Sequence, residues 1–263
     1  MNILITNIEF SDYNGTTLYV KELALSLKKK GNNVQIYSLT IGKIGEELIS
    51  KGVPATNNLK EITFTPDIIH AHHNINTLDV ISYFKKTPVI FWIHDRIHKY
   101  DYPLLHKNII QYVSVDYNCK ERYKKDLNFN EKDSKVIYNW VNLNRFKLKN
   151  NINSAPKKAL IFSNYAKNNH HLKEIKKACH QSQISLDVIG SKSGNTKYDP
   201  ENYLNDYDII FAKAKAAMES IATGAGVIVC DFTGLAGFIT SKNVSFYRKY
   251  NFGMKLMKLP ITS

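Results

Sequence analysis

The chain has little cysteine and no long apolar run. It contains three cysteines in 263 residues, Cys119, Cys179 and Cys230, and their spacing fits neither a disulfide framework nor a metal-binding motif. This usage is typical of a reducing compartment. No stretch approaches the roughly 18 apolar residues of a membrane span, and the opening MNILITNIEF predicts a strand instead of a signal peptide. We therefore expect a cytoplasmic protein.

Acidic residues are few relative to basic ones. Thirty-six Lys and Arg against 23 Asp and Glu give a formal net charge of +13. This excess favours an anionic partner, which could be a nucleotide diphosphate, an anionic membrane surface or nucleic acid. Nucleic acid is the weakest of the three, because no stretch interleaves basic and aromatic residues in an RNA-binding pattern.

Cofactor and metal motifs are also missing. The chain has no G-x-G-x-x-G, so an NAD site is not supported. The predicted strand Pro66–His73 ends in three histidines, but no cysteine or carboxylate stands at ligand spacing from them. We expect no metal and no cofactor.

The hydrophobic pattern predicts an α/β protein with two Rossmann-like domains. Its length suits two domains of about 100–150 residues, and the family resemblance described below implies a first domain at 1–146 and a second, smaller one at 158–263. The polar stretch 147–157, KLKNNINSAPK, is typical of a linker. In the second domain a strand at 208–212, a helix at 214–223 and a strand at 226–230 predict a parallel βαβ unit with ligand-facing loops.

The turn SDYNGTT precedes a predicted helix at 16–30. Gly15 and Thr16 therefore place backbone N–H groups at a helix N-terminus, where a phosphate or sugar oxygen can bind. An ordinary capped turn accounts for the same residues equally well.

His94 and Asp95 follow the predicted strand 89–92. A histidine at the end of a parallel strand is well placed to contact a ligand, and Asp95 could orient its ring. The alternative is a structural histidine that is hydrogen-bonded within its loop.

Glu219 stands on the predicted helix 214–223. Its carboxylate can accept hydrogen bonds from a diol such as a ribose, although position alone favours an ordinary solvated glutamate.

Several segments resemble a known family. MESIATGAGVIV resembles the LEAMACG segment and following strand of retaining GT-B glycosyltransferases of the bacterial lipopolysaccharide and capsule type, which are family 4-like, group 1 enzymes. PDIIHAHH resembles their PDVVHAH strand, and IYNWVNLNRF resembles their I-P-N-G-V-D-x-x-x-F element. Together with the Gly-containing turn and the VSVDYNCKERY segment, five such regions occur in family order.

The resemblance implies two Rossmann-like domains that face a cleft, with the nucleotide sugar bound by the second. It implies that Glu219 holds the ribose and that His94 contacts the transferred sugar. Other donor-binding residues implied by position are the turn residues Gly15 and Thr16, the cations Lys167, Lys213 and Lys215, Gly190 near the nucleotide base, and the backbone N–H groups of Gly234 and Leu235.

The chain departs from the family pattern in several places. Phe211 occupies the first position of the family's Glu-x7-Glu motif, and only Lys167 stands where a pair of diphosphate-binding cations is usual. Relatives also usually continue into a further C-terminal helix, so we expect a truncated or compact variant. These departures leave open an inactive or regulatory relative that binds nucleotide sugar without turnover.

A third alternative is a basic protein that binds anionic surfaces. Between residues 147 and 183 there are eight lysines and a single acid, Glu174. A solvated basic face is the ordinary explanation of such a run.

The resemblance implies a glycosyltransferase that moves a sugar from a nucleotide-sugar donor to a lipid-linked or polysaccharide acceptor, with retained configuration and without a metal. Asp206-Tyr207-Asp208 has the D-x-D form of the metal-binding GT-A enzymes, but it precedes a strand and is not expected to bind metal. Peripheral contact with the inner face of an anionic membrane fits this function, and nucleic acid does not.

Overall fold

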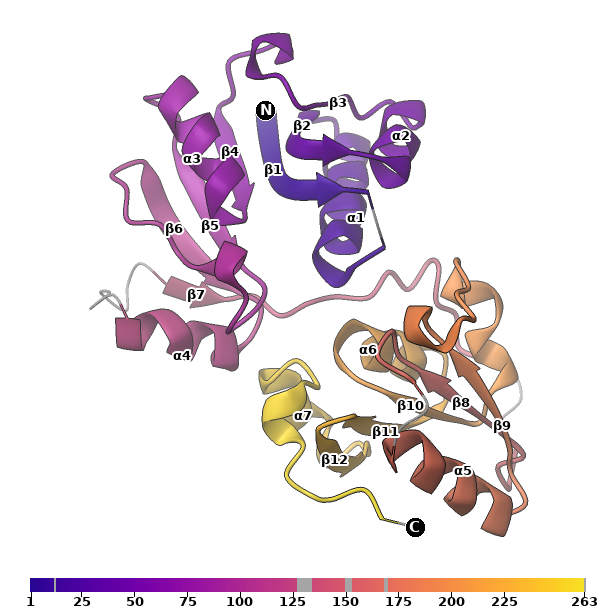
Figure 1. The fold of residues 1–263 in the computed structure, drawn as a ribbon. Helices are drawn as coiled ribbons and strands as arrows, with labels where there is room; N and C mark the ends of the chain where they lie inside the picture. The colour runs from indigo at the N-terminus through magenta and orange to yellow at the C-terminus, as the bar shows by residue number, and fades with distance from the viewer. Residues whose placement is uncertain (12, 127–133, 150–152, 168–169, 263) are drawn as a thin grey trace. The chain divides into compact units, whose positions relative to one another are not determined.

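The computed structural model describes residues 1–11, 13–126, 134–149, 153–167 and 170–262. The chain forms two compact units, Met1–Ile137 and Tyr138–Ser263 (Figure 1). Each unit is built around its own β-sheet, as the alternating strand and helix pattern predicts.

The first unit contains a seven-stranded sheet in the order β3-β2-β1-β4-β5-β6-β7, and all of its neighbouring strands are parallel. The chain winds outward from β1 in one direction through β2 and in the other through β4. The carboxyl ends of β1 and β4 therefore form a topological switch point, which is the usual ligand site of such sheets. The strands are β1 (Asn2–Phe10), β2 (Asn33–Ile41), β3 (Ala55–Thr56), β4 (Ile68–His72), β5 (Val89–Ile93), β6 (Ile109–Ser114) and β7 (Ser134–Val136).

The helices of this unit are α1 (Gly15–Lys29), α2 (Lys43–Ser50), α3 (Asn74–Tyr83) and α4 (Tyr117–Asp126). Asn14 caps the N-terminus of helix α1, since its side-chain oxygen accepts a hydrogen bond from the Thr17 N–H at 2.8 Å. The helix ends before Gly31, whose φ of 82° lies in the left-handed region that favours glycine.

The second unit contains a five-stranded sheet in the order β12-β11-β10-β8-β9. Its strands are β8 (Lys158–Phe162), β9 (Ser185–Ile189), β10 (Ile209–Ala212), β11 (Gly226–Asp231) and β12 (Gly234–Phe238), with helices α5 (His170–Gln181), α6 (Ala214–Ala222) and α7 (Val244–Lys249). Only β12 runs antiparallel to its neighbour. The predicted fold class, two Rossmann-like α/β domains, is confirmed.

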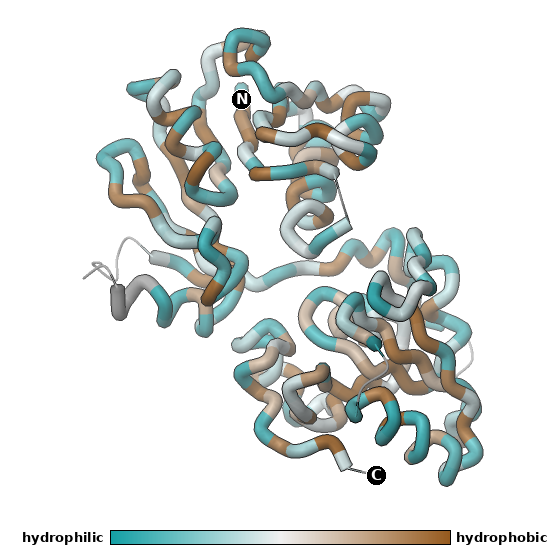
Figure 2. Tube along the Cα trace, in the orientation of Figure 1, coloured by the Kyte–Doolittle hydropathy of each residue, from teal (hydrophilic) through white to brown (hydrophobic). Residues whose placement is uncertain are grey.

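Apolar residues alternate between the two faces of the second sheet. Leu160 belongs to one buried cluster, whereas its neighbours Ala159 and Ile161 belong to another. Helix α5 contributes Leu172 and Ile175 to the second cluster, and α6 contributes to the first. Figure 2 shows hydrophobic residues along the strands of the second sheet.

The boundary between the units lies earlier than the expected end at residue 146. Phe146 is buried in the core of the second unit, and the Arg145 guanidinium makes two hydrogen bonds of 2.7 Å to the Glu201 carboxylate. Residues 138–146 therefore belong to the second unit, because their apolar and charged side chains find their partners there.

The stretch 244–257 is helical only in part. Helix α7 ends at Lys249, since Asn251 and Phe252 adopt positive φ angles of 52° and 50°. A short 3-10 helix, Met254–Leu256, follows. Among the described residues, none of the helices has both the length and the apolar composition of a membrane span.

Asp208 lies just before β10, as expected for a residue at a strand start. Its hydrogen bonds connect this position to the segment that leads into β8. Its carboxylate accepts hydrogen bonds from the backbone N–H groups of Lys157 (2.9 Å) and Lys158 (3.1 Å) and from the Lys149 ammonium (3.1 Å). Partial burial opposes ionisation, but these hydrogen bonds outweigh it and lower the pKa of Asp208 to about 2.

We predict that Asp208→Asn lowers the free energy of unfolding by about 2 kcal/mol at pH 7. Because the pKa of Asp208 is lower in the folded chain than in the unfolded one, this stabilisation is present above about pH 4 and is lost as the pH falls toward 2. Urea unfolding of both proteins between pH 7 and 2 measures it. A difference that does not depend on pH would contradict the assignment.

Candidate active site

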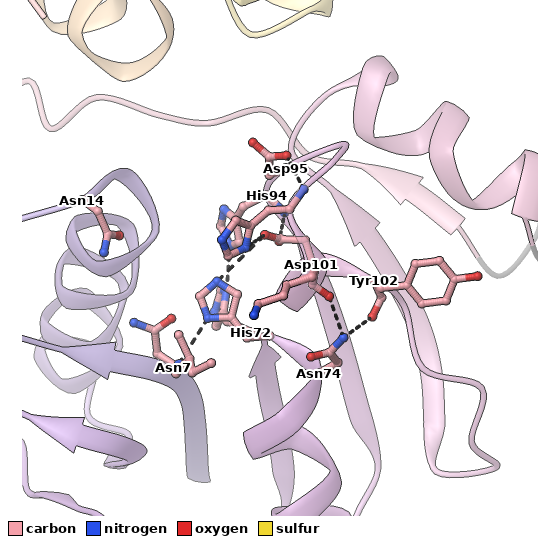
Figure 3. Close-up of polar contacts among 12 residues, drawn as sticks. Asn7, Asn14, His72, Asn74, His94, Asp95, Asp101 and Tyr102 are labelled. Carbon is pink, nitrogen blue, oxygen red and sulfur yellow. Dashed lines mark hydrogen bonds and ion pairs between the residues drawn. The ribbon is translucent and has the colours of Figure 1, made fainter. Parts of the chain in front are cut away.

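Three histidine rings form a hydrogen-bonded row at the carboxyl ends of β4 and β5. The Nδ1 atom of His72 lies 2.7 Å from Nε2 of His94, and the Nε2 atom of His72 lies 2.9 Å from Nδ1 of His70. Figure 3 shows His72 and His94 next to each other. The pairing of β4 with β5 sets His72 opposite Trp92, which brings the residue just after β5 beside the end of β4.

Aromatic rings enclose this row. Trp92 stacks on His70 with ring centroids 4.3 Å apart, and Tyr19 of α1 makes edge contacts with His72 and His94 at 5.8 Å and 5.0 Å. Burial lowers the pKa of His70 to about 4, and burial together with the neighbouring histidines holds the pKa of His72 and His94 well below the usual value. The three rings are therefore neutral at pH 7.

Asp101 supports the backbone of His94. This carboxylate, at the end of a 3-10 helix (Lys99–Asp101), is buried and accepts the backbone N–H of His94 at 2.7 Å (Figure 3). Burial raises the pKa of Asp101 to about 7. The ring nitrogens His73 Nε2 and His98 Nδ1 each lie 3.9 Å from its other oxygen. Sequence reasoning missed Asp101, which stands in no recognisable motif.

Asp95 does not have the expected role of orienting the His94 ring. It is exposed, and its carboxylate accepts the backbone N–H groups of Ile97 and His98 at 2.6 Å and 2.8 Å, which holds its own loop. The ring of His94 is bonded to His72 instead. The alternative of a hydrogen-bonded histidine is therefore correct for His94, although the partner is His72 of β4 and not a residue of its own loop.

Gly15 and Thr16 form the start of α1, as predicted. Gly15 is exposed, and the Asn14 cap takes the N–H of Thr17. In residues that the structure describes, no hydrogen bond occupies the N–H groups of Gly15 and Thr16. Asn7 of β1 is buried nearby, and its Oδ1 atom has no partner among the described residues. Asn7, which the sequence did not single out, thus presents a buried polar atom at the switch point.

Glu219 lies on α6 in the second unit. It is only 6% exposed and lies 3.6 Å from the ammonium of Lys215, one helical turn earlier. The expectation of an ordinary solvated glutamate is therefore wrong.

Lys213 directly follows β10 and forms an ion pair with Asp231, a buried carboxylate at the end of β11. Its ammonium also lies 4.4 Å from the ring centroid of Tyr165. Lys192, in the loop after β9, lies 4.9 Å from the same ring. The charge of Lys213 is thus already balanced, and Lys192 is a further cation at this edge that the sequence analysis did not select.

Gly190 has a structural reason for being glycine. Its φ is 158°, and a Cβ atom there would lie 1.9 Å from the backbone oxygen of Ser163. The next residue, Ser191, donates its N–H to Asn164 Oδ1 at 3.2 Å, so the loops after β8 and β9 are tied together. Lys167 is exposed on the first of these loops, beside residues 168–169, which lie outside the described residues.

Gly234 and Leu235 do not form the expected open loop. Both belong to β12, and the Leu235 N–H donates to the carbonyl of Leu259 at 2.8 Å. A Cβ atom at Gly234 would lie 2.8 Å from that same carbonyl. The Leu235 N–H is therefore not available to a nucleotide sugar, because it is hydrogen-bonded to the C-terminal segment.

No group of three or more histidine, cysteine or acidic side chains with the geometry of a metal site occurs in the part of the chain that the structure describes.

A sequence model of Glycosyltransferase Family 4 matches residues 13–145, which is half of the chain. The chain belongs to this family. The match includes the turn before α1, the histidine row and the Asp101 region, so these elements are features of a glycosyltransferase. No curated protein sequence matches the chain.

Solved glycosyltransferase structures share the fold of this family 4 chain. HepE from Anabaena, crystallised with UDP-glucose, is 14% identical with a TM-score of 0.60, and the match covers 91% of this chain and 85% of HepE. A glycosyltransferase from Rickettsia africae is 14% identical with a TM-score of 0.64, covering 86% and 78%. The lipopolysaccharide outer core galactosyltransferase WaaB is 9% identical with a TM-score of 0.58, covering 86% and 80%. The glycosyltransferase thus has the GT-B fold.

We predict that Lys213→Met destabilises the second unit by about 3 kcal/mol, because it leaves the buried Asp231 carboxylate without its cation. Asp231→Asn should cost less, since the Lys213 side chain is 19% exposed and its ammonium can reach water. Denaturant unfolding of the two variants measures both effects. An equal loss of unfolding free energy in the two variants would contradict the prediction that an unpaired Asp231 carboxylate is more destabilising than an unpaired Lys213.

Proposed function

We propose that this glycosyltransferase transfers a sugar from a nucleotide-sugar donor to a lipid-linked or polysaccharide acceptor, with retained configuration and without a metal. The main support is Glu219, a carboxylate buried on helix α6 of the β10-α6-β11 unit. Lys213, at the carboxyl end of β10, and the ring of Tyr165 lie at the same edge of the sheet. A carboxylate in the position of Glu219 can accept hydrogen bonds from the two hydroxyl groups of a ribose diol.

The donor site is proposed at the carboxyl edge of the second sheet. The strand order reverses there between β8 and β10, as it does at a nucleotide-binding switch point. Lys192 and Lys167 supply positive charge for the diphosphate, whereas the ion pair with Asp231 balances the charge of Lys213. The exposed rings of Tyr165 and Phe232, with centroids 5.7 Å apart, and the Gly190 loop suit a nucleotide base. In this proposal the N–H of Leu235 no longer binds the nucleotide sugar, because it is bonded to Leu259.

The chemistry requires stabilisation of a departing diphosphate and of an oxocarbenium-like sugar. The lysines serve the leaving group, so the mechanism as proposed uses no metal or other cofactor. His94 is proposed to contact the transferred sugar through its ring. The helix start at Gly15 and Thr16 offers N–H groups for a sugar or phosphate oxygen.

The titles of two structures that share the fold, WaaB and WaaG, name lipopolysaccharide as the product to which these enzymes contribute. They support an acceptor of that class, and we propose a location in the cytoplasm, at the inner face of an anionic membrane. The net charge of +13 favours such contact.

Glu219→Gln tests the donor site. We predict that it weakens binding of the preferred nucleotide sugar tenfold or more, since it removes a charged acceptor for the ribose hydroxyls. Thermal stability without ligand should change much less. Titration calorimetry with UDP-, GDP- and ADP-sugars measures the affinity. Glu47→Gln is the matched control, because Glu47 also pairs with a lysine on a helix but lies in the first unit. Unchanged affinity in folded Glu219→Gln would contradict the site.

Turnover separates the proposed enzyme from its alternatives. At 100 times the dissociation constant, the donor should stabilise the fold by about 2.7 kcal/mol, with or without EDTA. Sugar transfer that survives EDTA is expected. Binding without transfer to any acceptor would favour a regulatory relative. Binding to anionic vesicles that falls steeply with salt, with no response to nucleotide sugars, would favour a surface-binding protein.

A further inference from the structure

Hydrogen bonds between ring nitrogens connect the three histidine rings at the carboxyl ends of β4 and β5. His72 uses both of its nitrogens in this row, Nε2 toward His70 and Nδ1 toward His94. A neutral imidazole has one N–H donor and one bare nitrogen acceptor. His72 must therefore donate to one neighbour and accept from the other.

This restriction links the protonation of all three rings. If His72 donates from Nδ1 to His94, then His70 must donate from its own Nδ1 to His72, and His94 carries its proton on Nδ1. If His94 donates from Nε2 to His72, then His72 donates from Nε2 to His70, and His70 carries its proton on Nε2 as well. The rings thus share one tautomer, either all Nδ1–H or all Nε2–H.

The shared tautomer decides what His94 can offer. Its Nε2 is used by His72, and its Nδ1 has no hydrogen-bond partner among the described residues. In the first arrangement this Nδ1 is a donor, and in the second it is a bare acceptor. A shift between the two moves one proton along each of the two hydrogen bonds, with one proton entering at one end and one leaving at the other.

We propose that His70 and His72 are positioning residues that set the tautomer of His94 and, with it, whether the sugar-facing histidine donates or accepts a hydrogen bond. This inference rests on the proposed function only for the role of His94. The row of rings is independent of that role. Thr6 and Trp92 hold the row rigid: the Thr6 hydroxyl bonds the backbone N–H and C=O of His72 at 3.0 Å and 3.2 Å, and Trp92 stacks on His70.

Nitrogen-15 NMR of histidine-labelled protein tests the row without any substrate. We expect His70, His72 and His94 to show the same neutral tautomer, whereas exposed His180 on α5 serves as an internal reference that averages both. Different tautomers within the row, or averaging at His94 like that at His180, would overturn the proposal.

His70→Phe keeps a ring against Trp92 but removes the nitrogen that bonds His72. We expect the tautomer of His94 to become mixed, and kcat to fall about tenfold or more while KM for the donor stays within about twofold. His70→Asn places an amide where Nδ1 stood and should restore both readouts in part, whereas His180→Gln should change neither.

The two proposals fail in distinguishable ways. An unchanged His94 spectrum in folded His70→Phe would overturn the positioning role, even if the wild-type enzyme transfers sugar. A shared tautomer that responds to His70→Phe, in a protein that transfers no sugar, would support the positioning role and contradict the proposed function.

Discussion

The first unit depends on the burial of His72 at the junction of β1, β4 and β5. Its side chain has no exposed surface, and a buried imidazole needs partners for both nitrogens. One partner comes from its own strand two residues earlier and the other from the residue after β5. The Thr6 hydroxyl on β1 bonds the backbone of His72 beyond Ile5, where the ladder between β1 and β4 stops. Three strands are thereby aligned at the end of the sheet where the sugar contact is proposed.

The same burial explains the chemistry of this edge. Desolvation keeps the histidines neutral, so they exchange hydrogen bonds and do not attract anions as cations would. Asp101 is buried under the loop that follows, and its pKa is raised for the same reason. The histidine row thus offers polar groups without charge, which suits contact with a sugar more than with a diphosphate.

The second unit carries its charge differently. Lys213 is neutralised by Asp231, whereas Lys192 lies over the exposed ring of Tyr165 and Lys167 is exposed. Phe211, which replaces an acidic residue of the family motif, packs against the apolar cluster beneath α5. Its position in β10 therefore serves the core, and Glu219 is left as the buried carboxylate of the β10-α6-β11 unit.

The fold class and most of the strands and helices could be predicted from the sequence alone, because apolar periodicity and glycine positions are local signals. Its motifs also identified the glycosyltransferase family and pointed to His94 and Glu219. The partners depend on the tertiary structure: His72 bonds the His94 ring, Asp101 accepts the His94 backbone N–H, and Asp231 pairs with Lys213. The tertiary structure also paired Leu235 with Leu259 and placed residues 138–146 in the second unit. These outcomes depend on contacts between residues distant in sequence, for which a local pattern carries no signal.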